Sequence, residues 1–189
     1  MMDRPPAVLR WPASFDKAQN LLIFGLATPP TPIRDTARQL VRRVLREILG
    51  NVELISVPGQ AIRLARPDSQ VGISVSHESG LSLLAINFSG PVGIDLLKTP
   101  DSRDWESHIP ALASDYLGPT IARQLADQAP QERMASFAQA WTAQEARLKC
   151  QGLALVEWSS ALEVSLAECC AQPLTLPAGY VGTVATKAA

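Results

Sequence analysis

The segment VGIDLLK, Val92–Lys98, is the stretch from which the fold can be built outward. Side chains alternate between the two faces of a β-strand, so this segment has an apolar face made of Val92, Ile94 and Leu96. Asp95 falls on the opposite face, with Gly93 and Leu97 as its neighbours. An aspartate at the end of a strand is usually a turn or capping residue, so Asp95 gains meaning only from a partner elsewhere.

A second segment, FAQAWTAQEARLK at Phe137–Lys149, is predicted to be helical. At 100° per residue the apolar side chains form one stripe, made of Met134, Phe137, Ala138, Trp141 and Leu148. Glu145 falls within this stripe, about 20° from Met134, and Lys149 lies one turn later at its edge. A buried carboxylate without a partner is costly, so Glu145 needs a cation, a hydrogen-bond donor or a wet cleft. An ion pair with Lys149 at i+4 is the alternative.

Asp95 and Glu145 together suggest a metal site. We predict that the two carboxylates meet across a cleft and hold one hard cation. Neither segment contains histidine or cysteine. A donor set made only of oxygen suits Mg²⁺, with phosphate and water completing the octahedron.

The composition is that of a globular protein, because 47% of the 189 residues are hydrophobic and 19% are charged. A net charge of −1 provides no overall field for nucleic acid. The odd number of cysteines argues against a disulfide framework, so we expect a reducing, cytoplasmic compartment. No apolar run reaches the length of about 18 residues that a membrane span needs. The first apolar run, Leu21–Ala27, is too short for a secretory signal.

Hydrophobic periodicity and turn residues divide the chain into two series of elements. The first series contains strands at 21–27, 71–76 and 81–88, one or two short strands within 52–64, and a helix at 32–49 that stops at Gly50. The second contains a strand at 92–98, helices at 104–117, from 119 onward and at 131–150, and strands near 162–166 and 180–186. This order predicts an α+β fold of two similar halves, residues 1–91 and 92–189.

The dipeptide Ser76-His77 ends an apolar strand shortly before Gly80. A serine hydroxyl and an imidazole N–H suit a phosphate group, although a lone histidine in such a place is more often a simple loop residue. A serine nucleophile with His77 as its base is a rival. That rival lacks a GxSxG elbow and an obvious orienting acid.

The basic residues Arg38, Arg66 and Lys149 could surround a polyanion together with Ser76 and His77, through charge-assisted hydrogen bonds. Taken singly, each is more often a solvated surface charge. The RxxxR spacing of the first long helix also fits nucleic acid. The neutral charge balance and the lack of interleaved aromatic residues argue against that partner.

These residues, in this order, resemble the 4′-phosphopantetheinyl transferase superfamily, in its monomeric two-halved (surfactin-synthetase-activating) type. The family pattern runs S-H, then G-[IV]-D, then W-[ST]-x-K-E-[AS]-x-x-K about fifty residues later. The matching residues are Ser76-His77, Gly93-Ile94-Asp95 and the nine residues from Trp141 to Lys149. The segment CQGLAL that follows is similar to the family's G-x-G-L.

The resemblance implies both the fold and the reaction. Two halves related by a pseudo-twofold axis, each a small antiparallel sheet on a long helix, would enclose a cleft for coenzyme A. The serine hydroxyl of an acyl, peptidyl or aryl carrier protein would attack the β-phosphate of coenzyme A bound with Mg²⁺. The serine would receive the phosphopantetheine arm and adenosine 3′,5′-bisphosphate would leave.

The resemblance also implies roles for the motif residues. Asp95 and Glu145 would be the metal ligands, with Glu145 as the base, directly or through water. Lys149 would contact the phosphates. Ser76 and His77 would meet the 3′-phosphate or nearby diphosphate oxygens.

Two further residues and two departures follow from the same likeness. Arg38 matches the helix arginine that binds the nucleotide phosphate, and Arg66 stands where many members have Lys-Pro beside the adenine.

Leu97 occupies the place of the second acid of D-x-E, so the metal would have two protein carboxylates. Gln144 replaces the usual lysine. Because of these departures, a non-catalytic relative that binds coenzyme A or a carrier protein is the alternative to an enzyme.

Carrier proteins present an acidic helix, so a basic and apolar lip is expected near the site. Our hypothesis places this lip on the loop at 101–108 or on the predicted helix at 104–117. Because the two halves lie in one chain, we expect a monomer.

Overall fold

The computed structural model of the chain describes residues 6–10, 19–29, 34–55, 63–65, 70–99 and 103–187. Its strands are β1 Val8–Arg10, β2 Leu21–Ala27, β3 Leu54–Ile55, β4 Arg63–Leu64, β5 Gly72–Glu78, β6 Leu81–Asn87, β7 Val92–Lys98, β8 Cys169–Pro173 and β9 Tyr180–Lys187. Its helices are α1 Arg34–Leu49, α2 Ile109–Leu112, α3 Gly118–Ala126, α4 Pro130–Cys150 and α5 Ser160–Leu166, with the short helical segments η1 Arg103–Ser107 and η2 Ala113–Leu117. This content confirms a mixed α+β fold. The pseudo-twofold relation and the division near residue 92 stay predictions.

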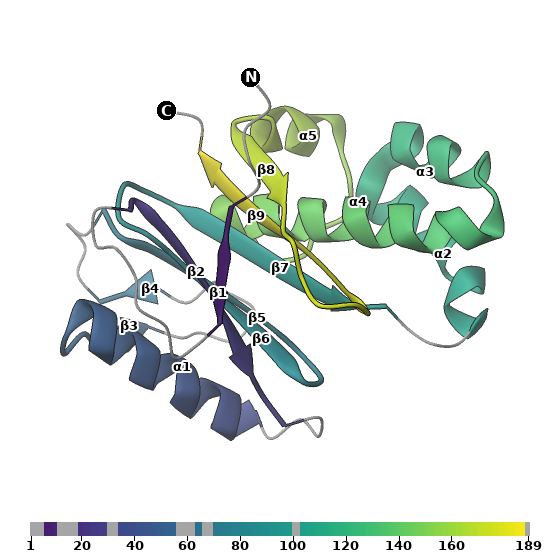
Figure 1. Cartoon of the computed structure of the whole chain (residues 1–189). Coiled ribbons are helices and arrows are strands. Elements are labelled where there is room, and N and C mark those ends of the chain that lie inside the picture. Colours follow the sequence, from purple (N-terminus) through teal and green to yellow (C-terminus); the bar gives the residue numbers. More distant parts are fainter. Residues whose placement is uncertain are drawn as a thin grey trace.

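The first sheet has the strand order β1-β2-β6-β5, and α1 covers one of its faces (Figure 1). The pairs β2–β6 and β5–β6 are antiparallel, whereas β1 runs parallel to β2. α1 packs on the sheet through apolar side chains at helical spacing, namely Val41, Val44 and Leu45. The helix stops before Gly50, whose φ of 78° suits glycine.

The second sheet has the strand order β7-β9-β8, with both pairs antiparallel, and α4 packs against it (Figure 1). Gly93 of β7 permits a very close approach of the helix. A Cβ at this position would lie 2.5 Å from the Cys150 nitrogen and nearer still to the Ala146 carbonyl oxygen. Because real Cβ atoms essentially never come closer than 3.0 Å to such atoms, only glycine allows α4 to lie where it does.

The two sheets are joined where β7 meets β5. Ser74 Oγ accepts the Ile94 N–H at 3.0 Å, and Ser76 Oγ accepts the Leu96 N–H at 3.2 Å. The serine hydroxyls thus take the place of the carbonyl groups that a neighbouring strand would offer to β7. Around them lies an apolar layer shared by both sheets, formed by Ile23, Leu83, Ala85, Val92, Ile94, Leu96 and Val184.

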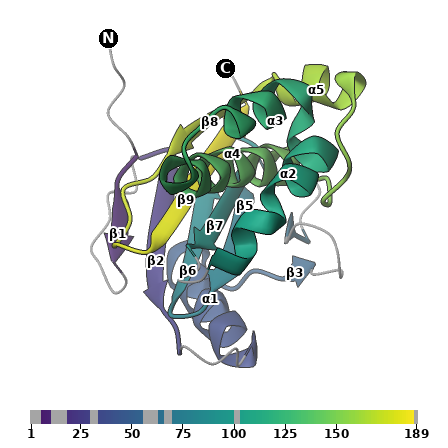
Figure 2. The ribbon, with the colours of Figure 1, turned by 90° about the vertical axis from the view of Figure 1, so that its right-hand side faces the viewer.

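The short helices α2 and α3 lie with α4 on the side of the strands opposite α1 (Figure 2). The single helix predicted at 104–117 is broken into η1, α2 and η2. Pro110 sits in the first turn of α2. Proline has no backbone N–H to donate, so a helix tolerates it in its first turn but not in its interior. None of the described helices has the length and apolar character needed to cross a bilayer.

The strand predicted near 162–166 is wrong, because this segment forms α5. Ser159 caps the helix, since its side chain accepts the Leu162 N–H at 3.2 Å. Val164 is 74% exposed, so the short apolar run does not belong to a sheet. β1 and β8 were not predicted, whereas the strands at β2, β5, β6, β7 and β9 and the long helices α1 and α4 confirm the predictions.

Candidate active site

Polar side chains from three elements meet where α4 crosses β7. Lys149 Nζ donates to Asp95 Oδ1 at 2.6 Å and to the Ile94 carbonyl oxygen at 3.2 Å. The same Nζ lies 3.9 Å from Glu145 Oε2. The side chain of Asp95 is 9% exposed, and those of Glu145 and Lys149 are 20% and 23% exposed. The structure therefore brings together the two acids and the lysine that the sequence singled out.

Ser76 of β5 contributes the third element of the site. Its Oγ donates to Asp95 Oδ1 at 3.0 Å while it accepts the Leu96 N–H. A serine hydroxyl has one proton to donate, and here that proton goes to Asp95. Ser76 thus orients the Asp95 carboxylate, and its contact to a phosphate stays a prediction.

Glu145 lies in the predicted apolar stripe of α4, because Phe137, Ala138 and Leu148 of that stripe are buried and Met134 and Trp141 are half-buried. One face carries Phe137 and Trp141 and packs on the short helices. The other carries Ala146 and Cys150 and packs on the second sheet. At 100° per residue Glu145 falls about 40° from Trp141 and about 20° from Ala138, so it lies on the buried side of the helix, where its side chain is 20% exposed.

Burial raises the pKa of Glu145 above the ordinary value of a glutamate. The Lys149 ammonium acts in the opposite direction, and the negative charge of Asp95 raises the pKa further. The two carboxylates are therefore close enough to interact electrostatically. A raised pKa makes the ionised carboxylate a stronger base than an exposed glutamate.

The oxygen atoms gathered here fit a hard divalent cation. Both side-chain hydrogen bonds to Asp95 fall on Oδ1, and Oδ2 accepts none from the described residues. Among the described residues, the Glu145 carboxylate is approached by the Lys149 ammonium group. The described residues form no group of three or more His, Cys, Asp and Glu side chains that could hold a metal ion. A cation bound by Asp95 and Glu145 would therefore need phosphate and water to complete its ligands.

His77 lies exposed near the end of β5, with Nδ1 2.8 Å from Ser82 Oγ. Partial desolvation lowers the pKa of His77, and the positive charges of Lys149 and then Arg38 lower it further. The neutral imidazole is therefore favoured. Arg66 lies outside the described residues, so its place beside a nucleotide stays a prediction.

Leu97 and Gln144 occupy the two positions that depart from the family pattern. Leu97 is half-buried and pairs with Val181, one step along the same face of β7 from Asp95. It provides no metal ligand. Gln144 is half-buried on α4 and brings no charge to the site.

A buried hydroxyl network next to Asp95 was missed by the sequence analysis. Thr183 pairs with Asp95 across β9 and β7. Its Oγ1 lies 2.9 Å from Thr142 Oγ1 and accepts the Gln139 amide at 3.0 Å. Both threonines are buried. The sequence feature that could have indicated this network is Thr142, a polar residue inside the WTAQE segment. The network links α4 to β9 beside the Asp95 carboxylate.

Aromatic side chains adjoin Glu145 on the helical side. Trp141, one helical turn before Glu145, packs on Phe137 with ring centroids 5.6 Å apart and meets Tyr116 edge-on at 5.7 Å. Trp105 continues the cluster, with its ring centroid 6.3 Å from that of Phe137. These rings form an aromatic cluster that begins one helical turn before Glu145.

The segment that contains the two acids and the lysine matches a known protein family. A protein-family model described as the 4′-phosphopantetheinyl transferase superfamily matches residues 91–182. The matched segment holds Asp95, Glu145 and Lys149, whereas Ser76 and His77 precede it. A search of curated proteins finds no match. Residues 91–182 of the chain therefore form a domain that belongs to the 4′-phosphopantetheinyl transferase superfamily.

Proposed function

We propose that this protein is a 4′-phosphopantetheinyl transferase that moves the phosphopantetheine arm of coenzyme A to a serine of a carrier protein. The observation that carries the proposal is the convergence of Asp95, Glu145 and Lys149 within the superfamily domain. Lys149 Nζ lies 2.6 Å from one carboxylate and 3.9 Å from the other. Two carboxylates beside an ammonium group match what a diphosphate and a divalent cation need.

In this proposal Asp95 and Glu145 would hold Mg²⁺, which when bound would neutralise charge on the diphosphate. Lys149 has three N–H donors, and Asp95 Oδ1 and the Ile94 carbonyl oxygen take two of them. The third is available to a phosphate oxygen. Ser76 keeps the Asp95 carboxylate oriented.

Glu145 is the proposed base, directly or through one water. The proton of the carrier serine passes toward Glu145 while the serine oxygen bonds to the β-phosphorus of coenzyme A. The bond from that phosphorus to the bridging oxygen breaks, and adenosine 3′,5′-bisphosphate leaves with the electron pair. The raised pKa of Glu145 supports this role. His77, Arg38 and Arg66 would bind the nucleotide end.

We also propose the two-halved, monomeric type. Support comes from the site itself, because Ser76 belongs to the first sheet and Asp95 to the second. A single chain thus supplies both sides. Light scattering of the purified protein would test the monomer, and a stable dimer would contradict it.

The test is transfer to an apo carrier protein in the presence of coenzyme A and Mg²⁺. Intact-mass measurement should show a gain of one phosphopantetheine arm. Asp95→Ala and Glu145→Gln should each abolish the gain, whereas Glu163→Gln, an exposed glutamate of α5, should leave it unchanged. Near-normal transfer by Glu145→Gln would show that another group takes the proton.

A non-catalytic relative that binds coenzyme A or a carrier protein is the second candidate. It is favoured by Leu97, which leaves the site with two protein carboxylates. Calorimetry with coenzyme A separates the two functions. Measurable binding without mass gain on acyl, peptidyl and aryl carrier proteins would favour the non-catalytic relative.

A further inference from the structure

The imidazole ring of His77 is held at its Nδ1 atom. His77 and Ser82 are paired across β5 and β6, and Nδ1 lies 2.8 Å from Ser82 Oγ. Ser82 is fully buried, whereas His77 is exposed. Nε2 forms no hydrogen bond with any residue that the structure describes. The ring therefore uses Nδ1 to contact the protein and keeps Nε2 available to a ligand.

Thr28 continues this contact beyond Ser82. Ser82 Oγ donates to Thr28 Oγ1 at 3.4 Å. A serine hydroxyl has one proton, so a proton that goes to Thr28 cannot also go to His77. Ser82 Oγ then accepts at the 2.8 Å contact, and Nδ1 carries the hydrogen. Because a neutral imidazole has a single N–H, Nε2 is left with a lone pair and no hydrogen.

The turn that follows His77 is fixed from both sheets. Tyr180 Oη of β9 donates to the Ser79 carbonyl oxygen at 2.6 Å. On the other side, the Thr28 N–H donates to the Gly80 carbonyl oxygen at 3.3 Å. Gly80 has a φ of 91°, and a Cβ there would lie 2.7 Å from Tyr180 Oη. The backbone that carries the imidazole is therefore held in one place.

Two cations influence the ring. Desolvation lowers the pKa of His77, and the Lys149 ammonium and then the Arg38 guanidinium lower it further. The neighbouring strands β2 and β6 contain no ionisable residue. The other ionisable residues of β5, β7 and the site-facing turn of α4 are Glu78, Asp95, Lys98 and Glu145. The two cations therefore oppose protonation of the ring until an anion offsets their charge.

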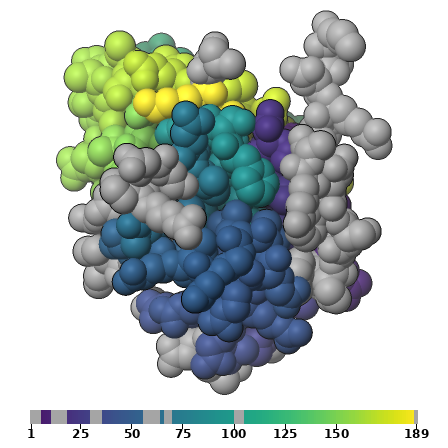
Figure 3. Space-filling view, turned by 90° about the vertical axis from the view of Figure 1, so that its left-hand side faces the viewer, coloured from purple at the N-terminus to yellow at the C-terminus, as the bar shows by residue number. Residues whose placement is uncertain are grey.

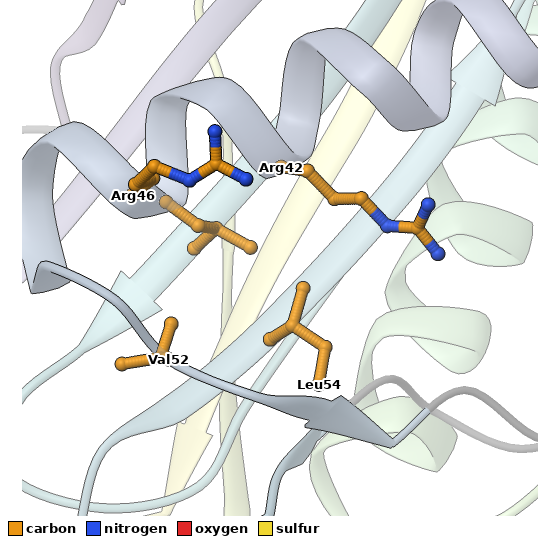
Figure 4. Close-up of a pocket in the computed structure, with 5 residues that line it drawn as sticks. Arg42, Arg46, Val52 and Leu54 are labelled. Atoms are coloured by element: carbon orange, nitrogen blue, oxygen red, sulfur yellow. The ribbon is translucent and has the colours of Figure 1, made fainter.

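The arginines further along α1 belong to a different feature. A pocket of about 230 Å³ lies between α1 and β3 (Figure 4), lined by Arg42, Leu45, Arg46, Val52 and Leu54. Figure 3 shows the face of the molecule on which α1 lies open to solvent. Neither His77 nor Ser82 lines this pocket. The positive charge that α1 brings to the imidazole is that of Arg38.

We propose that Ser82 and Thr28 are positioning residues that fix the hydrogen of the neutral His77 ring on Nδ1, so that a phosphate group binds at Nε2 only when the ring takes up a second proton. The phosphate part rests on the proposed function, in which His77 binds the nucleotide end of coenzyme A. The hydroxyl pair itself requires no assumption about the reaction.

The proton requirement follows from the chemistry of the two partners. A phosphate oxygen and a bare Nε2 are both acceptors, so they repel each other. When a proton from solvent joins Nε2, the ring becomes an imidazolium and its new N–H donates a charge-assisted hydrogen bond to the phosphate. The affinity for the phosphate group therefore falls as the pH rises from the pKa of His77 in the free protein to its pKa in the complex.

Nitrogen NMR of the protein with isotope-labelled histidine tests the hydrogen position directly. The chain contains two histidines, and the exposed His108, whose side chain makes no capping bond, provides the reference. At pH 8 the His77 ring should carry its hydrogen on Nδ1. In Thr28→Val the proton of Ser82 loses its acceptor, so Ser82 should donate to Nδ1 and the His77 hydrogen should move to Nε2.

Two further variants complete this experiment. Ser82→Ala removes the hydroxyl altogether, so the His77 signals should average over both tautomers, as those of the exposed His108 do. Ser89→Ala, at an exposed serine in the turn after β6, should leave the His77 signals unchanged. A wild-type ring with its hydrogen on Nε2 would overturn the proposal. So would a Thr28→Val protein that melts at a lower temperature while the hydrogen stays on Nδ1, because Thr28 would then be merely structural.

Calorimetry counts the proton that binding takes up. Coenzyme A is titrated at pH 7 into the wild-type protein and into Thr28→Val, in buffers that differ in ionisation enthalpy. The protons exchanged by the phosphates of coenzyme A cancel in the difference between the two proteins. The wild-type protein should take up about half a proton more per coenzyme A than Thr28→Val, whose Nε2–H can donate while the ring stays neutral. Equal uptake by the two proteins would overturn the linkage.

The outcomes also separate this proposal from the transferase. The expected hydrogen positions and proton difference, with no transfer to any apo carrier protein, would support the role of Ser82 and Thr28 and refute the enzyme. Normal transfer by a wild-type protein whose His77 hydrogen lies on Nε2 would refute that role and leave the enzyme standing.

Discussion

Gly93→Ala should separate α4 from β7 and disable the site without touching any polar side chain. The added methyl group would lie 2.5 Å from the Cys150 nitrogen and 2.9 Å from the Ala146 carbonyl carbon. Since such contacts are essentially never shorter than 3.0 Å, the Cys150 contact alone requires a movement of at least 0.5 Å, the difference between the two distances. Both obstacles are helix backbone, which cannot rotate away. The helix must therefore shift as a whole.

The shift has consequences for stability and for rate. Overpacking of a core costs about 1–3 kcal/mol, which in a chain of this size lowers the melting temperature by about 2–12 °C. Lys149 would lose its bonds to Asp95 and to the Ile94 carbonyl oxygen, which measure 2.6 and 3.2 Å. Misplacement of catalytic groups by about 1 Å can cost 100-fold in rate. We expect a folded protein whose kcat for transfer falls by about this factor.

Gly25→Ala is the matched control. Gly25 also lies buried in a strand, but a Cβ there would lie no closer than 3.4 Å to its neighbours. Its melting temperature should stay level or rise slightly, because alanine restricts the unfolded chain, and its transfer rate should stay normal. Thermal unfolding followed by circular dichroism and the intact-mass assay provide both readouts. A normal melting temperature and normal kcat for Gly93→Ala would refute the close packing of α4 on β7.

Three further predictions concern the polar residues. Burial raises the pKa of Glu145, so the folded protein binds the carboxyl proton of Glu145 more tightly than the unfolded chain does. The free energy of unfolding that this proton contributes is lost as the pH rises through the pKa of the folded state. In buffer without divalent ions Glu145→Gln should therefore melt higher than the wild-type protein at pH 7, and a gain that persists at pH 4 would contradict the shift. Ser76→Ala should lower stability by about 1–3 kcal/mol, because it leaves the buried Leu96 N–H without its acceptor; urea unfolding measures this loss, and a loss equal to that of Ser165→Ala on the surface of α5 would be inconsistent with it. Leu97→Glu should lower the Mg²⁺ concentration needed for half-maximal transfer, because it adds a carboxylate on the face that carries Asp95; an unchanged Mg²⁺ requirement would mean that this side chain does not reach the ion.

The strand alternation of VGIDLLK predicted β7 with its observed bounds and the face of Asp95. The apolar periodicity around Phe137–Lys149 likewise predicted a helix at 131–150, which the structure has at Pro130–Cys150. Both predictions rest on periodicity, which is a local property. The approach of Glu145 to Asp95 is not local, and the sequence suggested it through the cost of a buried acid and through the resemblance to the family pattern.

Other features depended on tertiary contacts that no local pattern contains. The helical wheel predicted the apolar stripe that contains Glu145, but it did not show that the neighbouring face of α4, with Ala146 and Cys150, packs on the second sheet. The apolar run near Val164 resembled a strand, whereas the capping bond from Ser159 selects a helix. The sequence shows Ser74 and Ser76, but it does not show that their hydroxyl groups accept hydrogen bonds from the backbone of β7.

The serine contacts of β7 also decide whether the superfamily domain can exist by itself. A fragment starting at residue 92 would lack Ser74 and Ser76, so the amides of Ile94 and Leu96 would have no acceptors. Its apolar layer would lose the partners supplied by β2 and β6. A bare strand edge above an uncovered apolar surface is a template for self-association. The region that defines the family would therefore aggregate as an isolated fragment, and its solubility depends on the part of the chain that the family match does not reach.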